Sequence, residues 1–177
     1  MEGRQNMATK TKKIVFTALM ASLTCVATMI IKIPTPLQGY IHLGDCIALL
    51  CGWTLGPVYG FLAAGIGSGL ADLLSGYFVY APVTFAIKGI VALIGYFLFR
   101  LIRGKRREVI GLCVSAVAAE LFMVGGYYLF EGIMYGFGAS LVNIPMNLVQ
   151  ALGGVVFGVV LMKAIGKYVS FDEDNKS

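Results

Sequence analysis

Long runs of apolar residues, separated by short polar segments, make up most of the chain. A helix that crosses a bilayer needs about 20 such residues. The runs predict helices near residues 14–32, 45–55, 57–74, 82–103, 109–130 and 140–166. Segment 45–55 is too short to span alone and ends at Gly56-Pro57, so it is either a short or tilted helix or half of a broken pair. We therefore expect an all-α integral membrane protein with six transmembrane helices.

Composition supports lipid as the solvent for this fold. Of the 177 residues, 58% are hydrophobic and 13% charged, and the mean hydropathy is +0.83. Soluble domains carry about 25% charged residues. The first apolar run is longer than the core of a signal peptide and has no small-residue cleavage site, which favours a retained helix. The expected organisation is a tail at 1–13, a six-helix domain at 14–168 and a second tail at 169–177.

The basic residues predict the orientation. The net charge of +5 could indicate nucleic acid, but the basic residues lie between apolar runs rather than on one face, so we expect no nucleic-acid partner. Cytoplasmic segments carry an excess of Lys and Arg. If both termini are cytoplasmic, twelve of the fourteen Lys and Arg residues lie on the cytoplasmic side, while Lys32 lies at an outer end and Lys88 within a span. The twelve are Arg4, Lys10, Lys12, Lys13, Arg100, Arg103, Lys105, Arg106, Arg107, Lys163, Lys167 and Lys176.

The predicted outer loops, 33–44, 75–81 and 131–139, are rich in aromatic and turn-forming residues. Two prolines and two glycines in the first favour a shaped loop rather than a helix. Tyrosines at a membrane interface form an aromatic belt, but belts mark both interfaces. One-sided enrichment therefore leaves a belt and an aromatic pocket open. Six of the nine tyrosines lie on this side: Tyr40, Tyr77, Tyr80, Tyr127, Tyr128 and Tyr135.

Polar residues within the predicted spans are the candidates for chemistry, because burying them in lipid is costly. Asn143, Asn147 and Gln150 form an amide stripe on one helix face, which could bind a ligand or join helices. Lys88 needs a partner at its depth, which Glu120 or Asp72 could supply. The pair is either structural or faces a ligand.

Two loop-proximal residues have simpler interpretations. Asp45 opens the second helix and is explained as its N-cap. His42 is the only histidine, and an interfacial loop position accounts for it as well as a catalytic role does.

Small residues repeat every four positions along two spans. In the third, Gly60, Ala64 and Ser68 indicate close helix packing. In the first, Ala18 and Ser22 indicate either internal packing or docking of a partner protein.

Motifs for catalysis are absent from the sequence. There is no GxxxxGK[ST] loop for ATP, no HExxH and no GxSxG. The four cysteines form no CxxC pair, so we expect neither a metal nor a disulfide, and no cofactor. A binding protein needs only a pocket with a few convergent polar groups. The sequence therefore favours binding over enzymatic activity.

Motifs in a fixed order along about residues 14–165 carry a family resemblance. They are Pro34-Thr-Pro-Leu-Gln-Gly-Tyr-Ile-His-Leu-Gly-Asp45, Leu55-Gly-Pro-Val-Tyr-Gly60, Gly65-Ile-Gly-Ser-Gly-Leu-Ala-Asp72, Gly76-Tyr77 and Ala81-Pro-Val-Thr-Phe-Ala-Ile-Lys88. With them the chain resembles the substrate-binding S components of energy-coupling factor (ECF) vitamin transporters. The resemblance implies a multi-pass protein of a prokaryotic plasma membrane that binds a water-soluble vitamin or precursor beneath the first outer loop. It also implies that a small-xxx-small stripe on the first helix docks a transmembrane coupling protein that carries two cytoplasmic ATPases. Here Ala18 occupies the first small position of that stripe and Ser22 the second.

The ligand that the resemblance implies is a heterocycle related to pyridoxine, hydroxymethylpyrimidine or riboflavin. Tyrosines suit stacking on a flat ring, and the amides supply donors and acceptors. A stand-alone carrier or channel, and a membrane-embedded enzyme or assembly factor, are the alternatives; the first lacks an internal repeat and the second a catalytic constellation. The predicted substrate contacts are Lys88, Asn147, Gln150, Glu120, Asn143, Tyr40, His42, Tyr77, Tyr80 and Thr84.

Overall fold

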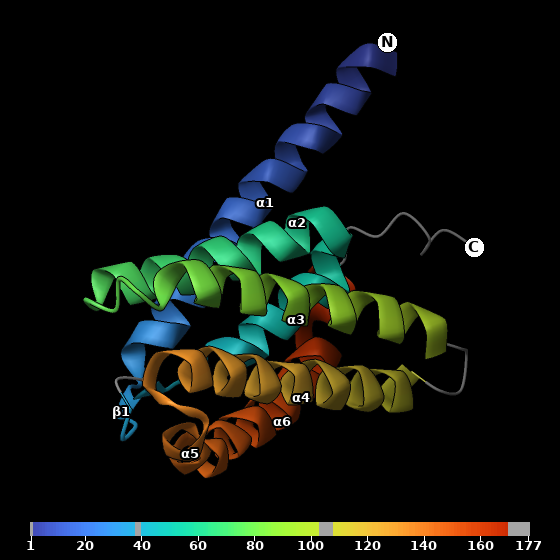
Figure 1. Ribbon diagram of the computed structural model, residues 1–177. Coiled ribbons are helices and arrows are strands. Elements are labelled where there is room, and N and C mark those ends of the chain that lie inside the picture. Colours follow the sequence, from blue (N-terminus) through green and yellow to red (C-terminus); the bar gives the residue numbers. More distant parts are fainter. Residues whose placement is uncertain (1, 38–39, 103–107, 170–177) are drawn as a thin grey trace.

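The computed structural model is an all-helical bundle (Figure 1). It describes residues 2–37, 40–102 and 108–169, with side chains from Lys10 to Ile165. The long helices are α1 (Glu2–Ile30), α2 (Gly44–Leu74), α3 (Ala81–Ile102), α4 (Glu108–Tyr135) and α6 (Ile144–Val169). The short elements are β1 (Ile33–Pro34), β2 (Tyr40–Ile41), α5 (Phe137–Ser140) and the 3₁₀ turn η1 (Leu141–Asn143).

Within the described residues, five helical segments are long and apolar enough to cross a membrane. They are Lys10–Ile30, Gly44–Leu74, Ala81–Ile102, Glu108–Tyr135 and Phe137–Ile165. The protein is therefore a multi-pass membrane protein, as the sequence predicts. The orientation of its termini stays a prediction, and Arg103–Arg107, part of its basis, lies outside the described residues.

The difference between the six predicted spans and five long helices lies in α2, which joins the predicted helices 45–55 and 57–74. Gly56 interrupts it with φ 80° and ψ −177°, a conformation that favours glycine, and Pro57 follows. Every residue from Gly44 to Gly56 is buried. The two parts of α2 also touch, since a Cβ at Gly60 would lie 2.7 Å from the Cys51 carbonyl oxygen. The short first part is thus enclosed by protein, which explains its length.

Small residues in the second part of α2 allow close packing on both sides. A Cβ at Gly65 would lie 2.8 Å from the carbonyl oxygen of Phe85 in α3. A Cβ at Gly67 would clash with Ala21 and Thr24 of α1. Gly60, Ala64 and Ser68 of the predicted stripe are themselves buried in the bundle, in keeping with the packing role predicted for them. Helix α4 completes the bundle by packing against α3 and α6.

Helix α1 has one buried and one exposed face. Met20, Thr24 and Thr28 are buried, while Ala18 and Ser22 are exposed among apolar side chains such as Leu19. Ala18 and Ser22 are therefore not part of the described core of this chain.

The described parts of the connection between α1 and α2, residues 31–37 and 40–43, gather with residues 75–80 and 136–143 at one end of the bundle, at the left of Figure 1. The first is a small antiparallel hairpin in which Ile33 pairs with Ile41 and Pro34 with Tyr40. This end of the bundle holds the candidate site.

Candidate functional site

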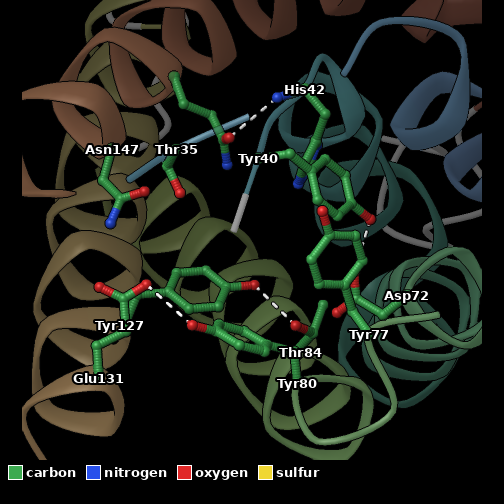
Figure 2. A pocket seen from close by; sticks show the side chains of 11 residues that line it. Thr35, Tyr40, His42, Asp72, Tyr77, Tyr80, Thr84, Tyr127, Glu131 and Asn147 are labelled. Carbon is green, nitrogen blue, oxygen red and sulfur yellow. Dashed lines mark hydrogen bonds between the residues drawn. The ribbon is translucent and has the colours of Figure 1, made fainter. Parts of the chain in front are cut away.

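A pocket lies beneath the β1–β2 hairpin, between the ends of α2, α3, α4 and α6 (Figure 2). Its cavity volume is about 30 Å³. The lining residues come from segments far apart in sequence. They are Thr35, Tyr40, His42, Asp72, Tyr77, Tyr80, Thr84, Tyr127, Glu131, Asn147 and Gln150.

Aromatic rings form much of the pocket wall. The ring centroids of Tyr40 and Tyr77 lie 5.0 Å apart, and Tyr77 meets Tyr80 edge-on at 6.3 Å. Tyr40 also lies 5.4 Å from the His42 ring. Four of the six outer tyrosines therefore line the pocket, whereas Tyr128 and Tyr135 do not. Such walls suit a flat ring.

Two carboxylates lie on opposite sides of the pocket in Figure 2. Asp72 accepts a hydrogen bond of 2.6 Å from the Tyr40 hydroxyl. Glu131 is 3% exposed, and its Oε1 accepts from Asn143 Nδ2 at 2.9 Å and from the Tyr80 hydroxyl at 3.5 Å. Its Oε2 is buried without a hydrogen-bond partner among the described residues. Acceptor groups thus remain open to a ligand.

A chain of polar contacts below the pocket joins four segments. The Lys88 ammonium donates to Asp45 Oδ1, and Gln150 Nε2 donates to Asp45 Oδ2 at 2.6 Å. The His42 backbone N–H in turn donates to Gln150 Oε1 at 3.0 Å. The chain therefore ties the hairpin segment to α6, α2 and α3.

This chain corrects two expectations. Lys88 pairs with Asp45 rather than with Glu120 or Asp72. Asp45 is not an N-cap: Leu43 holds that position, without a side-chain hydrogen bond. The reason is that Asp45 starts α2 with its side chain inside the bundle, where the buried ammonium is a stronger partner than the backbone N–H groups.

Seven of the ten predicted contacts line the pocket, namely Tyr40, His42, Tyr77, Tyr80, Thr84, Asn147 and Gln150. Lys88 is fully buried and lies beneath, 5.4 Å from the Tyr127 ring centroid. Glu120 is buried, and neither of its oxygens has a hydrogen-bond partner among the described residues. Asn143 reaches the site only through Glu131. A ligand role for these three stays a prediction.

His42 is neutral in this environment. Burial and the nearby Lys88 charge lower the pKa of His42 to about 3. Its Nδ1 accepts the Gly44 backbone N–H at 3.0 Å, which requires that nitrogen to be unprotonated. Burial also raises the pKa of Tyr40 and of Tyr80. The hairpin segment therefore brings no positive histidine charge to the pocket at neutral pH.

Sequence reasoning left four lining residues out of the predicted contacts: Thr35, Asp72, Tyr127 and Glu131. Glu131 was expected in a loop, because the apolar run ends near residue 130, but α4 continues to Tyr135. Its spacing of four from Tyr127 places both on one face of α4, a signal the sequence contained.

Comparison with known proteins agrees with this architecture. A family model described as "ECF-type riboflavin transporter, S component" matches residues 8–167. The chain belongs to this family of transporter S components. The family comprises transporter subunits rather than enzymes, and the chain is accordingly a membrane substrate-binding subunit for a vitamin or vitamin precursor.

Two curated relatives align over most of their length. An uncharacterized protein of Pyrococcus woesei is 34% identical over 148 residues, covering 80% of this chain and 95% of the relative. The thiamine precursor transporter HmpT of Lactococcus lactis subsp. cremoris is 26% identical over 164 residues, covering 87% of each. The S-component identity suggested by the sequence motifs is confirmed.

Proposed function

We propose that this S component belongs to an ECF-type ABC importer in a prokaryotic plasma membrane and captures a pyridoxine-, hydroxymethylpyrimidine- or riboflavin-like heterocycle. The observation that carries this proposal is the pocket beneath the hairpin, walled by tyrosines and edged by amide and carboxylate groups. Pockets for small molecules combine such apolar walls with a few placed polar groups. The name of the Lactococcus relative, a thiamine precursor transporter, favours a ligand of this size.

Entry of the ligand requires the hairpin segment Pro34–Gly44 to move. The cavity volume of about 30 Å³ is far below the roughly 300–1,000 Å³ of ligand pockets. The described contacts over the pocket are few: the Tyr40–Asp72 bond, the His42–Gln150 bond and a Tyr80 hydroxyl bond of 3.1 Å to the Leu37 carbonyl. A hairpin held by a few hydrogen bonds can open without disturbing the helices beneath it.

In an ATP-driven importer the ATPase activity would come from partner proteins, because this sequence has no GxxxxGK[ST] loop. The proposed partners are a transmembrane coupling protein and two cytoplasmic ATPases. The exposed small residues Ala18 and Ser22 on α1 supply the docking stripe.

Mass spectrometry of the purified protein, together with uptake assays, tests the proposal. We expect a co-purifying vitamin or precursor, and uptake only when the coupling protein and ATPases are co-expressed. Uptake by this chain alone would instead support a stand-alone carrier. A folded protein that binds none of the candidate vitamins would contradict the proposal.

A further inference from the structure

The charges around the pocket are asymmetric. Two acidic residues, Asp72 and Glu131, line it, and no Lys or Arg does so within the described residues. The positive charge of Lys88 lies below and is matched by Asp45. Lys32 does not line the pocket; its Nζ lies 5.2 Å from the Tyr40 ring centroid and donates to Ser75. Among the described lining residues, an anionic group would therefore meet two carboxyl groups and no cation.

Glu131 supplies the second observation. Its Oε2 is buried and lacks a hydrogen-bond partner among the described residues, although Oε1 accepts from Asn143. Leaving a buried acceptor unpaired is costly, and a donor on a bound ligand would remove that cost. An ionised Glu131 accepts through this oxygen, whereas a protonated one would carry its proton there and donate, so the match requires Glu131 to be ionised in the complex.

Asn147 lies on the same side of the pocket as Glu131, whereas Asp72 lies opposite, with the rings of Tyr80 and Tyr127 between them (Figure 2). The structure records no hydrogen bond of the Asn147 amide to another described side chain, so both its donor and its acceptor are open to a ligand. A carboxyl acceptor and an amide donor on one side of the pocket suit an edge on which an amino group adjoins a ring nitrogen.

We propose that the pocket selects a flat, amino-substituted heterocycle of the aminopyrimidine class. Glu131 accepts a hydrogen bond from the amino group of this ligand, and Asn147 donates one to its ring nitrogen. The pocket rejects vitamins that bear a phosphate or carboxylate group. This inference rests on the proposed function and specifies the ligand of the same site. The ring lies over Tyr80 and Tyr127, and Asp72 adds to the exclusion of anions.

Calorimetric titration of the detergent-purified full chain tests the selectivity. The probes are 4-amino-5-hydroxymethyl-2-methylpyrimidine, the same ring without its amino group, its phosphate ester, pyridoxine and riboflavin. We expect loss of the amino group to weaken binding by about 5- to 150-fold, the cost of one unpaired buried group. The phosphate ester should bind at least about tenfold more weakly because it faces two carboxyl groups.

Glu131→Gln places an amide beside the ligand's amino group and should lower affinity by about 5- to 150-fold. Glu108→Gln is the matched control, since Glu108 is an exposed residue at the opposite end of the same helix. That variant should retain wild-type affinity. If Glu131→Gln fails to fold, as judged by its melting curve, the probe series on the wild-type protein decides alone.

The outcomes separate this inference from the proposed function. Tight binding of pyridoxine or riboflavin, with no advantage for the amino-bearing ring over the ring without it, would overturn the inference and leave the proposed function standing. Equal affinity for the phosphate ester would also overturn it. A folded protein that binds none of the probes would contradict both.

Discussion

Three buried ionisable side chains lie beneath the pocket on three helices: Asp45 of α2, Lys88 of α3 and Glu120 of α4. Lys88 and Asp45 form an ion pair, and Glu120 lies close by, since a Cβ at Gly154 would come within 2.9 Å of Asp45 and 2.7 Å of Glu120. Removing one partner of a buried pair leaves an uncompensated charge. This pairing favours a structural role for Lys88 in the scaffold that holds the pocket, which the variant Lys88→Met tests against a ligand role.

Lys88→Met should lower the melting temperature of the ligand-free protein, because Asp45 loses its cation at a cost of about 3–5 kcal/mol. The affinity for ligand should change less than in a variant of a lining residue such as Asn147. Calorimetric titration beside ligand-free melting curves measures both quantities. In the double variant Lys88→Met with Asp45→Asn, part of the stability should return. A large loss of affinity with an unchanged melting temperature would show that Lys88 contacts the ligand.

His42 predicts a pH dependence. Its folded pKa of about 3 lies below its ordinary value, so between these values the unfolded chain binds a proton that the folded chain does not. Stability is full above about pH 6.5 and falls with pH below it, by about 2 kcal/mol at pH 5. Melting temperatures from pH 8 to 5 measure this fall.

His42→Asn is the control for that prediction, because an asparagine oxygen can accept the Gly44 N–H as Nδ1 does, without titrating. We expect a shallower fall in melting temperature with acid for this variant. If the melting temperature of His42→Asn falls with acid as steeply as that of the wild type, the pH dependence belongs to other groups, such as the buried carboxyl groups.

At the residue scale the sequence identified which side chains were costly to bury, but not their partners. Lys88 required a counter-ion, yet Asp45 lies 43 positions away and reaches it only through the packing of α2 on α3. Periodicity within a helix cannot express such a pairing. The partners of the amide stripe could not be predicted for the same reason. Gln150 hydrogen-bonds Asp45 and the His42 backbone, whereas Asn143 hydrogen-bonds Glu131.

At the element scale the apolar runs located every long helix, because lipid demands about 20 apolar residues per span. Their ends were less certain, as α4 runs on past 130 to Tyr135. The sequence also predicted the break at Gly56-Pro57, since glycine followed by proline tends to interrupt a helix. The sequence did not show how closely the two parts of α2 approach, because that depends on the contact between Gly60 and Cys51 on either side of the break.

Helix α1 carries the prediction about partners. Ala18→Leu adds bulk to the exposed stripe and should abolish uptake in cells that contain the coupling proteins, while ligand affinity stays unchanged. Leu23→Met, at an exposed position of the same helix that lies off the repeat of four formed by Ala18 and Ser22, should leave uptake intact. Transport assays paired with titration separate the two effects. Lost ligand binding in Ala18→Leu would show instead that the stripe supports the fold.

At the scale of the whole molecule, the clustering of Lys and Arg predicts that both termini face the cytoplasm. Single cysteines placed at positions 38 and 135, in a chain lacking the four natural ones, should react with an impermeant thiol reagent in intact cells. A cysteine at position 105 should not react until the membrane is permeabilised. Labelling at 105 in intact cells would reverse the topology and place the pocket on the cytoplasmic side.

The central claim is that the pocket beneath the hairpin is where a vitamin or precursor binds. Titration of the vitamin panel into wild-type protein and Asn147→Ala tests it most directly, with the exposed Glu108→Gln as control. We predict one vitamin that binds the wild type with a single site, an affinity about 5- to 150-fold weaker in Asn147→Ala, and no change in the control. A vitamin bound equally well by all three proteins would place the binding site elsewhere.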